Sequence, residues 1–453
     1  MSFPRPSFPG QPQPPMQGYN SAYPPYSGPP PTFNPPPGPP PPQQYYSPPP
    51  GPPPGHTDRH GASYNPVYTS LPPPSHSYAP AAGYAPPPGP PPHLNTQPYN
   101  PSYHHPHPNA GAPNQPISLY LNVQVPTPAG PQQPPPPVLG YDPTGDYERV
   151  RKATKGFGTD EAALIKTLAP LDAMKMANLS SVFKSKSGKS LAEVLEKETG
   201  GWFRTTLHAV VLGPLWYDVE LANQSIRGLG TDETLLTEII VDRTQNDLNL
   251  LSIAYRQRYG RNFESEIRGD LSAKTERMFS MILANNRPPD NAPVDHSQVE
   301  RDVAILYKAA QGKIGTDEIA FCEVIVNRSR PHLTALCDAY GRKYKSLTKV
   351  IKSEFSGHMR FALLYIVNGA KNKHINEGQG VWRDAKLIEA SMKGIGTKDK
   401  QLVWRIARSH WDKNRFQAIK TAYQKKYKKS LESRVAGETS GDYKKMLLAL
   451  IVA

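Results

Sequence analysis

The stretch that decides the fold reads Lys155-Gly156-Phe157-Gly158-Thr159-Asp160-Glu161. It recurs as Arg227-Gly228-Leu229-Gly230-Thr231-Asp232-Glu233, and in altered form as Lys313-Ile314-Gly315-Thr316-Asp317-Glu318 and Lys393-Gly394-Ile395-Gly396-Thr397-Lys398-Asp399. In the first two copies an acid, Glu198 or Asp270, follows the first glycine by 42 residues. A peptide loop paired with a distant carboxylate offers the oxygen ligands that a hard cation such as calcium prefers. This pairing is the main evidence for function.

Apolar residues recur at fixed distances after each motif. Six and ten residues past the second glycine stand Leu164 and Leu168, Leu236 and Ile240, Phe321 and Ile325, Leu402 and Ile406. An aromatic and then a helix-length block closing on an apolar residue follow in each copy: Phe183 and Leu191, Tyr255 and Phe263, Tyr340 and Leu347, Tyr423 and Leu431. The i, i+4 spacing indicates one face of a helix. We therefore predict an all-α array of four repeats, each of about 70 residues.

The domain layout follows from the repeat spacing and two interruptions between helical segments. Repeats are predicted at 142–213, 214–285, 299–370 and 382–453, with linkers at 286–298 and 371–381. The first linker contains two proline interruptions, which are typical of connections between helices. Cys322 and Cys337 lie in apolar helical stretches, so they are predicted to be buried and inert rather than disulfide-bonded.

The first 137 residues differ in composition from the rest of the chain. Pro, Gly, Tyr, Ser and Asn dominate them, and only Arg5, Asp58 and Arg59 are charged. We predict that this head is disordered with local polyproline II structure. Of the net charge of +14, the remainder of the chain carries +13, which favours attraction to anionic lipid or nucleic acid. Without a signal-like start or a long apolar run, a cytoplasmic protein that does not span membranes is expected.

The loop chemistry has alternatives that the sequence leaves open. Glycines allow positive φ, so a loop can aim successive carbonyls at one point. Thr159 is expected to be the N-cap of the next helix, with Asp160 and Glu161 in its first turn. A single copy also fits a plain helix–helix corner, and Asp270 also fits an N-cap of the following helix. Glutamate is a poor N-cap, and three of the four acids are glutamate, which favours the ligand interpretation.

Other chemistries lack their motifs. The chain has no phosphate-binding Gly-x-x-x-x-Gly-Lys loop, no EF-hand loop and no zinc-type spacing of Cys and His. The histidines are scattered, and no Ser/His/Asp grouping emerges from their positions. A binding protein is therefore expected rather than an enzyme.

From about Asp142 to Ala453 the chain resembles an annexin. The resemblance rests on the four glycine loops, the distant acids and the closing stretch Glu438-Thr439-Ser440-Gly441-Asp442-Tyr443. It implies a curved disc of four five-helix repeats that binds anionic phospholipid membranes through Ca²⁺ on its convex face. The protein is then expected to become peripheral on membranes when calcium rises, in membrane trafficking, organisation or repair.

The resemblance also implies a ligand set for each repeat, made of three carbonyls and one carboxylate. The sets are Thr154, Gly156, Gly158 and Glu198; Ile226, Gly228, Gly230 and Asp270; Ala310, Lys313, Gly315 and Glu354; and Met392, Gly394, Gly396 and Glu438. Sites one and two rank first, then four, where Lys398 places a cation nearby, then three, where Lys313 replaces a glycine. The loop tips Phe157, Leu229, Ile314 and Ile395 are expected to contact the membrane; the alternative is that they pack on their own helices.

The head resembles the long Pro/Gly/Tyr heads of certain annexins, which dock small calcium-binding adaptors and favour condensates. A plain tether is the alternative for this segment. A different class of function also remains: an RNA-associated condensate scaffold, with weak nucleic-acid binding by the Tyr/Pro-rich head and the basic core. The head holds only two arginines to support stacking with bases.

Overall fold

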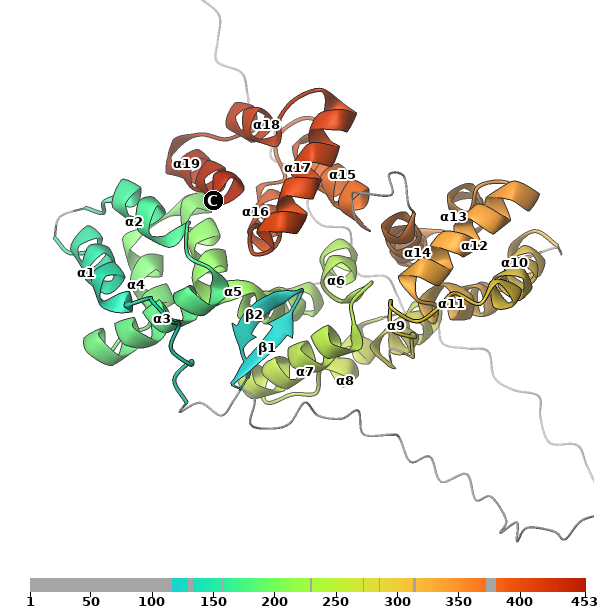
Figure 1. The fold of residues 1–453 in the computed structure, drawn as a ribbon, viewed down its shortest axis with the longest axis horizontal. Coiled ribbons are helices and arrows are strands. Elements are labelled where there is room, and N and C mark those ends of the chain that lie inside the picture. The colour runs from blue at the N-terminus through green and yellow to red at the C-terminus, as the bar shows by residue number, and fades with distance from the viewer. Residues whose placement is uncertain are drawn as a thin grey trace, which may run out of the picture. The chain divides into compact units, whose positions relative to one another are not determined.

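The protein is described by a computed structural model, shown in Figure 1. The structure describes residues 116–128, 133–156, 158–228, 230–271, 273–284, 286–312, 315–371 and 380–453. The chain divides into two units, Met1–Tyr99 and Asn100–Ala453, and every described residue belongs to the second. Predictions for residues 1–115, and for Phe157, Leu229, Lys313 and Ile314, lie outside the described residues.

The described chain forms four successive groups of helices (Figure 1). The first comprises α1 (Pro143–Ala153), α2 (Glu161–Leu168), α3 (Ala173–Ser187), α4 (Leu191–Glu198) and the first half of α5 (Gly201–Ile226). The second comprises the other half of α5, α6 (Glu233–Ile240), α7 (Gln245–Tyr259), α8 (Phe263–Asp270) and α9 (Ala273–Ala284). The third comprises α10 (His296–Ala310), α11 (Glu318–Val326), α12 (Arg330–Lys343), α13 (Leu347–Glu354) and α14 (Gly357–Ala370). The fourth comprises α15 (Val381–Met392), α16 (Asp399–His410), α17 (Lys413–Tyr427), α18 (Leu431–Glu438) and α19 (Gly441–Val452).

These groups confirm the predicted fold class of four helical repeats with five helical segments each. The division of α5 between two repeats follows from a kink, because Gly213 has a φ of 73° and Pro214 cannot continue a helix. The residue-by-residue boundaries of the repeats stay predictions. No helix in the described part of the chain is long and apolar enough to cross a membrane.

The core consists of the residues that the repeat spacing identifies. All of them are at most 2% exposed: Leu164, Leu168, Phe183, Leu191, Leu236, Ile240, Tyr255, Phe263, Phe321, Ile325, Tyr340, Leu347, Leu402, Ile406, Tyr423 and Leu431. Burial of each such side chain contributes about 1.5–3 kcal/mol. Cys322 and Cys337 are buried free thiols, as predicted, and burial raises the pKa of each to about 12.

An aspartate, not a threonine, caps the second helix of the repeats. The N-cap side chain of α2 is Asp160, which accepts a hydrogen bond from Ala163 N at 2.9 Å. Asp232 and Asp317 cap α6 and α11 in the same way. The prediction that Thr159 is the N-cap is therefore wrong. In the fourth repeat Lys398 stands at this position and makes no side-chain cap bond.

A β-hairpin precedes the first helix and corrects the prediction that residues 1–137 are disordered throughout. Strands β1 (Ile117–Tyr120) and β2 (Val123–Pro126) pair antiparallel across a two-residue turn with positive φ. Tyr120 is completely buried and donates a hydrogen bond to Asp218 Oδ2 at 2.8 Å. Leu121 N donates to Asp247 Oδ1 at 2.8 Å. A two-stranded hairpin is marginal alone, so docking to α5 and α7 stabilises it.

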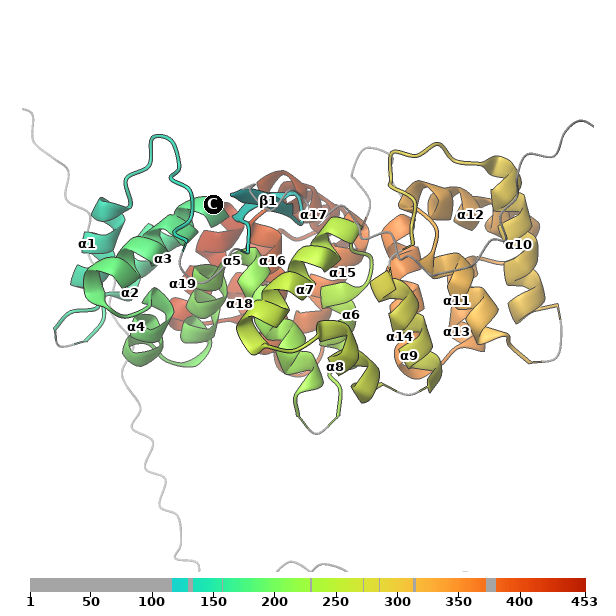
Figure 2. The same ribbon diagram turned by 90° about the horizontal axis from the view of Figure 1, so that it is seen from below.

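Figure 2 relates the hairpin to the candidate loops. The described ends of α1 and α2, of α5 and α6, and of α10 and α11, which flank these loops, point to its lower side. The hairpin lies on the upper side. The loops of these repeats therefore share a face that is opposite to the hairpin.

Candidate metal sites in the four repeats

The described parts of the loop between the first and second helix share two backbone features in the four repeats. Its glycines have positive φ values: 116° and 86° in the first repeat, 155° and 85° in the second, 83° at Gly315, and 115° and 77° in the fourth. A backbone N–H after the second glycine returns to the end of the first helix in every copy: Asp160 to Ala153, Asp232 to Ser225, Asp317 to Ala309 and Lys398 to Ser391. The residue after each acceptor is the predicted first carbonyl ligand, namely Thr154, Ile226, Ala310 and Met392.

A threonine ties each loop to its distant acid. The hydroxyl of Thr159 donates to the carbonyl of Glu198 at 2.7 Å. In the other repeats the threonine reaches the carboxylate itself: Thr231 to Asp270 at 2.5 Å, Thr316 to Glu354 at 3.2 Å and Thr397 to Glu438 at 3.1 Å. The loop and the acid, about 40 residues apart in sequence, are therefore neighbours in all four repeats.

Each acid occupies an electrostatically unfavourable place. Glu198, Asp270, Glu354 and Glu438 are the last residues of α4, α8, α13 and α18. The C-terminal end of a helix carries partial negative charge, which disfavours a carboxylate there. This position also removes the alternative in which Asp270 is the N-cap of the following helix. Four acids at four helix C-termini are expected where a cation compensates them.

The first two repeats differ in how their acids are surrounded. Among the described residues, none donates a hydrogen bond to the side-chain oxygens of Glu198, which is exposed. In the second repeat a further acid, Glu266, lies one helical turn before Asp270. Glu266 pairs with Arg227 and with Arg261, the latter at 3.1 Å. Two arginines thus already compensate the charge of Glu266. The Glu198 carboxylate has no such partner among the described residues, so it is open to an incoming ion.

The third repeat departs from the others at the end of its first helix. Its loop-closing bond reaches Ala309, one residue earlier than the motif alignment indicates, so the loop contains an extra residue. The carboxylate of Glu354 accepts from Ser353 at 2.9 Å as well as from Thr316. The loop keeps its threonine tie, and Lys313 lies outside the described residues.

The fourth repeat contains a functional residue, Arg434, that the repeated motif does not predict. Arg434 Nη2 donates to Met392 O at 2.6 Å, and Nη1 pairs with the carboxylate of Glu438. One guanidinium thus contacts two of the four predicted ligands. The matching positions in the first and third repeats hold Val194 and Val350. The spacing of four residues between Arg434 and Glu438 on one helix was the signal in the sequence.

One loop tip can be described directly. Ile395 is fully exposed, with a relative exposure of 109%, so it does not pack on its own helices. The other predicted membrane-contact residues lie outside the described residues. No cluster of three His, Cys, Asp or Glu side chains suited to a metal occurs in the described part of the chain. A cation at these loops therefore depends on backbone carbonyls.

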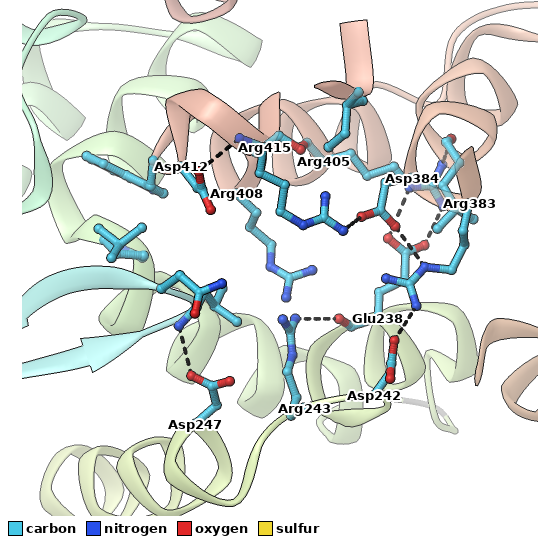
Figure 3. A pocket seen from close by; sticks show the side chains of 18 of the residues that line it. Glu238, Asp242, Arg243, Asp247, Arg383, Asp384, Arg405, Arg408, Asp412 and Arg415 are labelled. Carbon is cyan, nitrogen blue, oxygen red and sulfur yellow. Dashed lines mark hydrogen bonds and ion pairs between the residues drawn. The ribbon is translucent and has the colours of Figure 1, made fainter. Parts of the chain in front are cut away.

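A charged cavity lies where the second and fourth repeats meet, away from the loops (Figure 3). It has a volume of about 290 Å³ and is lined by six arginines and six acidic residues, with the hairpin turn at one side. Arg405 Nη2 lies 2.5 Å from Glu238 Oε1, and Arg415 Nη2 lies 2.6 Å from Asp384 Oδ2. These ions pair with each other, so the cavity has a structural role in joining the repeats. No motif in the sequence predicts it, because its lining residues come from distant segments.

The geometry defines a class of protein: a four-repeat helical array with a carbonyl-rich loop and a helix-terminal acid in every repeat. The sequence profile of the Annexin family matches residues 146–210, 217–282, 301–366 and 383–450. Annexin C1 of Cryptococcus neoformans var. grubii is 46% identical over 335 residues, which cover 74% of this chain and 70% of that protein.

Solved structures agree with the sequence comparison. A structure of annexin III superposes with a TM-score of 0.64 at 29% identity, covering 70% of this chain and 96% of that one. A calcium-bound annexin (Sm)1 superposes with a TM-score of 0.60 at 25% identity, covering 70% and 92%. The chain belongs to the annexin family. This family is known for calcium-dependent phospholipid binding, and its members are generally binding proteins rather than enzymes.

Proposed function

We propose that this protein binds anionic phospholipid membranes in a calcium-dependent manner through the loops of its repeats. The observation that carries the proposal is the threonine tie, which holds a helix-terminal acid against a carbonyl-rich loop in every repeat. The first site comprises the carbonyls of Thr154, Gly156 and Gly158 with the Glu198 carboxylate. The second comprises Ile226, Gly228, Gly230 and Asp270.

The ligand count explains why calcium and lipid act together. Three carbonyls and one bidentate carboxylate supply about five of the six to eight oxygens that calcium takes. A phosphate oxygen of a lipid headgroup completes the shell, so each site alone is weak, with a Kd of about 10⁻⁴–10⁻³ M. Several sites on one face bind the same membrane together, which lowers the calcium concentration required for membrane binding. By linkage, lipid raises the affinity for calcium by the same factor as calcium raises the affinity for lipid.

The biological role follows from reversible attachment. A cytoplasmic protein that becomes peripheral on membranes when calcium rises suits membrane trafficking, organisation or repair. The head offers polyproline segments to a partner such as a small calcium-binding adaptor. The RNA-scaffold alternative depends on the head, which lies outside the described residues, and we do not favour it.

Sedimentation of the full chain with phosphatidylserine vesicles tests the proposal. We expect pelleting in millimolar calcium, release by chelator, and loss of the calcium-dependent part in Glu198→Gln/Asp270→Asn. Glu196→Gln/Glu264→Gln is the matched control, because it removes two acids from the same helices but outside the loops. Equal calcium-dependent pelleting by both double variants would refute the assignment of the sites.

A further inference from the structure

We infer that the fourth loop contacts an anionic phospholipid bilayer without calcium, because the guanidinium of Arg434 takes the place of the cation. This inference rests on the proposed function, since it takes the loops to be the membrane-facing side. It departs from that function in one respect: the fourth repeat is expected to bind the bilayer when calcium is absent.

The first observation is the position of the guanidinium. Arg434 contacts the carbonyl of Met392 and the carboxylate of Glu438, and its Nε lies 3.4 Å from Glu389 Oε2. The second carboxylate oxygen of Glu438 accepts from Thr397 at 3.1 Å. Both oxygens of the predicted ligand are therefore engaged by the protein. A calcium ion at this loop has to displace a resident positive charge that already compensates the helix-terminal acid.

The second observation is the reversal of charge at this loop. Residues 393–400 carry three basic and one acidic side chain, and Arg434 offsets Glu438, which gives a formal charge of +2. The matching residues of the first repeat, 155–162 with 194 and 198, carry one basic and three acidic side chains, or −2. The corresponding charge is −3 in the second repeat and −2 in the third. Only the fourth loop attracts phosphate on its own.

The third observation is the exposed surface around the tip. Lys393, Lys398 and Lys400 are exposed, and the fully exposed Ile395 lies between them. An apolar tip flanked by lysines suits the boundary between headgroups and acyl chains of a bilayer. Single-stranded nucleic acid is bound instead through stacking aromatics, and this tip is aliphatic. The loop therefore fits a lipid surface better than RNA.

Vesicle binding by the full chain in chelator and about 0.1 M salt, where the screening length is about 10 Å, tests the inference. The probe is vesicles of phosphatidylserine and phosphatidylcholine. Lys393→Gln/Lys398→Gln is expected to weaken binding about tenfold or more, because each lysine near an anionic surface contributes about fivefold. The control Lys426→Gln/Lys429→Gln removes the same charge from the end of α17 and the connection that follows it, which α18, about 12 Å long, separates from Glu438. It is expected to change binding about twofold or less. Equal losses in the two variants would overturn the inference in favour of net charge alone.

The second test measures the number of calcium ions that the protein binds in the presence of the same vesicles. Glu438→Gln in the wild-type background should leave the number of bound calcium ions unchanged, and a loss of one ion would overturn the inference. Glu198→Gln/Asp270→Asn should remove the calcium-dependent binding and spare the binding in chelator. If calcium-dependent binding persists in that variant, the assignment of the first two sites fails; if wild-type binding does not respond to calcium at all, the proposed function fails, and in both cases the lysine variants still decide the inference. If the lysine variant loses affinity for a single-stranded RNA but not for vesicles, the loop is a nucleic-acid surface and the inference is wrong.

Discussion

Replacing Asp242 with asparagine is expected to lower the free energy of unfolding by about 3–5 kcal/mol, the cost of breaking a buried ion pair. The Asp242 side chain is 5% exposed and pairs with Arg287 at 3.2 Å, Arg330 at 3.1 Å and Arg383 at 2.7 Å. These arginines come from the first linker, the third repeat and the fourth repeat. Asp242 has a φ of 64°, which asparagine also tolerates, so the substitution removes charge without straining the backbone.

Urea unfolding of the full chain at neutral pH, followed by circular dichroism, measures this loss. Asp290→Asn is the matched control, because Asp290 pairs with the same Arg330 at 3.3 Å but is 40% exposed. An exposed pair contributes about 0–1 kcal/mol. A loss below about 1 kcal/mol in Asp242→Asn would refute the view that this carboxylate joins three parts of the protein.

The pH dependence of the unfolding free energy tests whether the effect of Asp242→Asn comes from the loss of its charge. Burial alone would raise the pKa of Asp242, but Arg330, Arg383 and Arg287 hold it far below its usual range. Because the folded pKa is below the unfolded value of about 3.9, the carboxylate stabilises the fold above that pH. Its contribution disappears as the pH falls further. The unfolding free energies of wild type and Asp242→Asn should therefore begin to converge as the pH falls below about 4 and become equal only below the folded pKa, and a constant difference would contradict a charge effect.

Three other changes have defined outcomes. Burial lowers the pKa of His358 and His410 to about 4, so each should cost about 2 kcal/mol of stability as the pH falls from 7 to 5, measured by urea unfolding; a flat profile would contradict this. Lys428 has a φ of 60° where the first two repeats have glycine, so Lys428→Gly should stabilise by about 1 kcal/mol in the same assay. Thr159→Val breaks the tie to Glu198 and should weaken calcium binding about tenfold by calorimetry with vesicles, with no change if the tie is incidental.

The helical repeat and its core could be predicted because both depend on local spacing. Apolar residues at i and i+4 must share a helix face, and the buried Leu164 and Leu168 lie where that rule places them. The juxtaposition of loop and acid was predictable for a different reason. A pattern that recurs four times reports a shared geometry even when its parts are about 40 residues apart.

Features that depend on contacts between distant segments could not be read from the sequence. Prolines surround the hairpin segment, so its composition predicts a disordered head, whereas its stability comes from Asp218 and Asp247, which are 98 and 126 residues away from their partners. The pairing of Asp242 with Arg383 spans 141 residues and follows no repeat. Threonine and aspartate both suit the N-cap of α2, so the sequence does not distinguish Thr159 from Asp160, and the structure shows that the Thr159 hydroxyl bonds to Glu198 instead.

The hairpin lies on the face of the described chain that is opposite to the candidate loops. It docks on Asp218 of α5, which also contacts Arg408 of the fourth repeat at 2.7 Å, so the start of the described chain is fixed where repeats meet. Figure 2 places this point on the side opposite to the candidate loops. A membrane held by the loops therefore leaves the attachment point of the head uncovered. The hairpin and a bilayer bound at the loops therefore occupy different faces of the described chain.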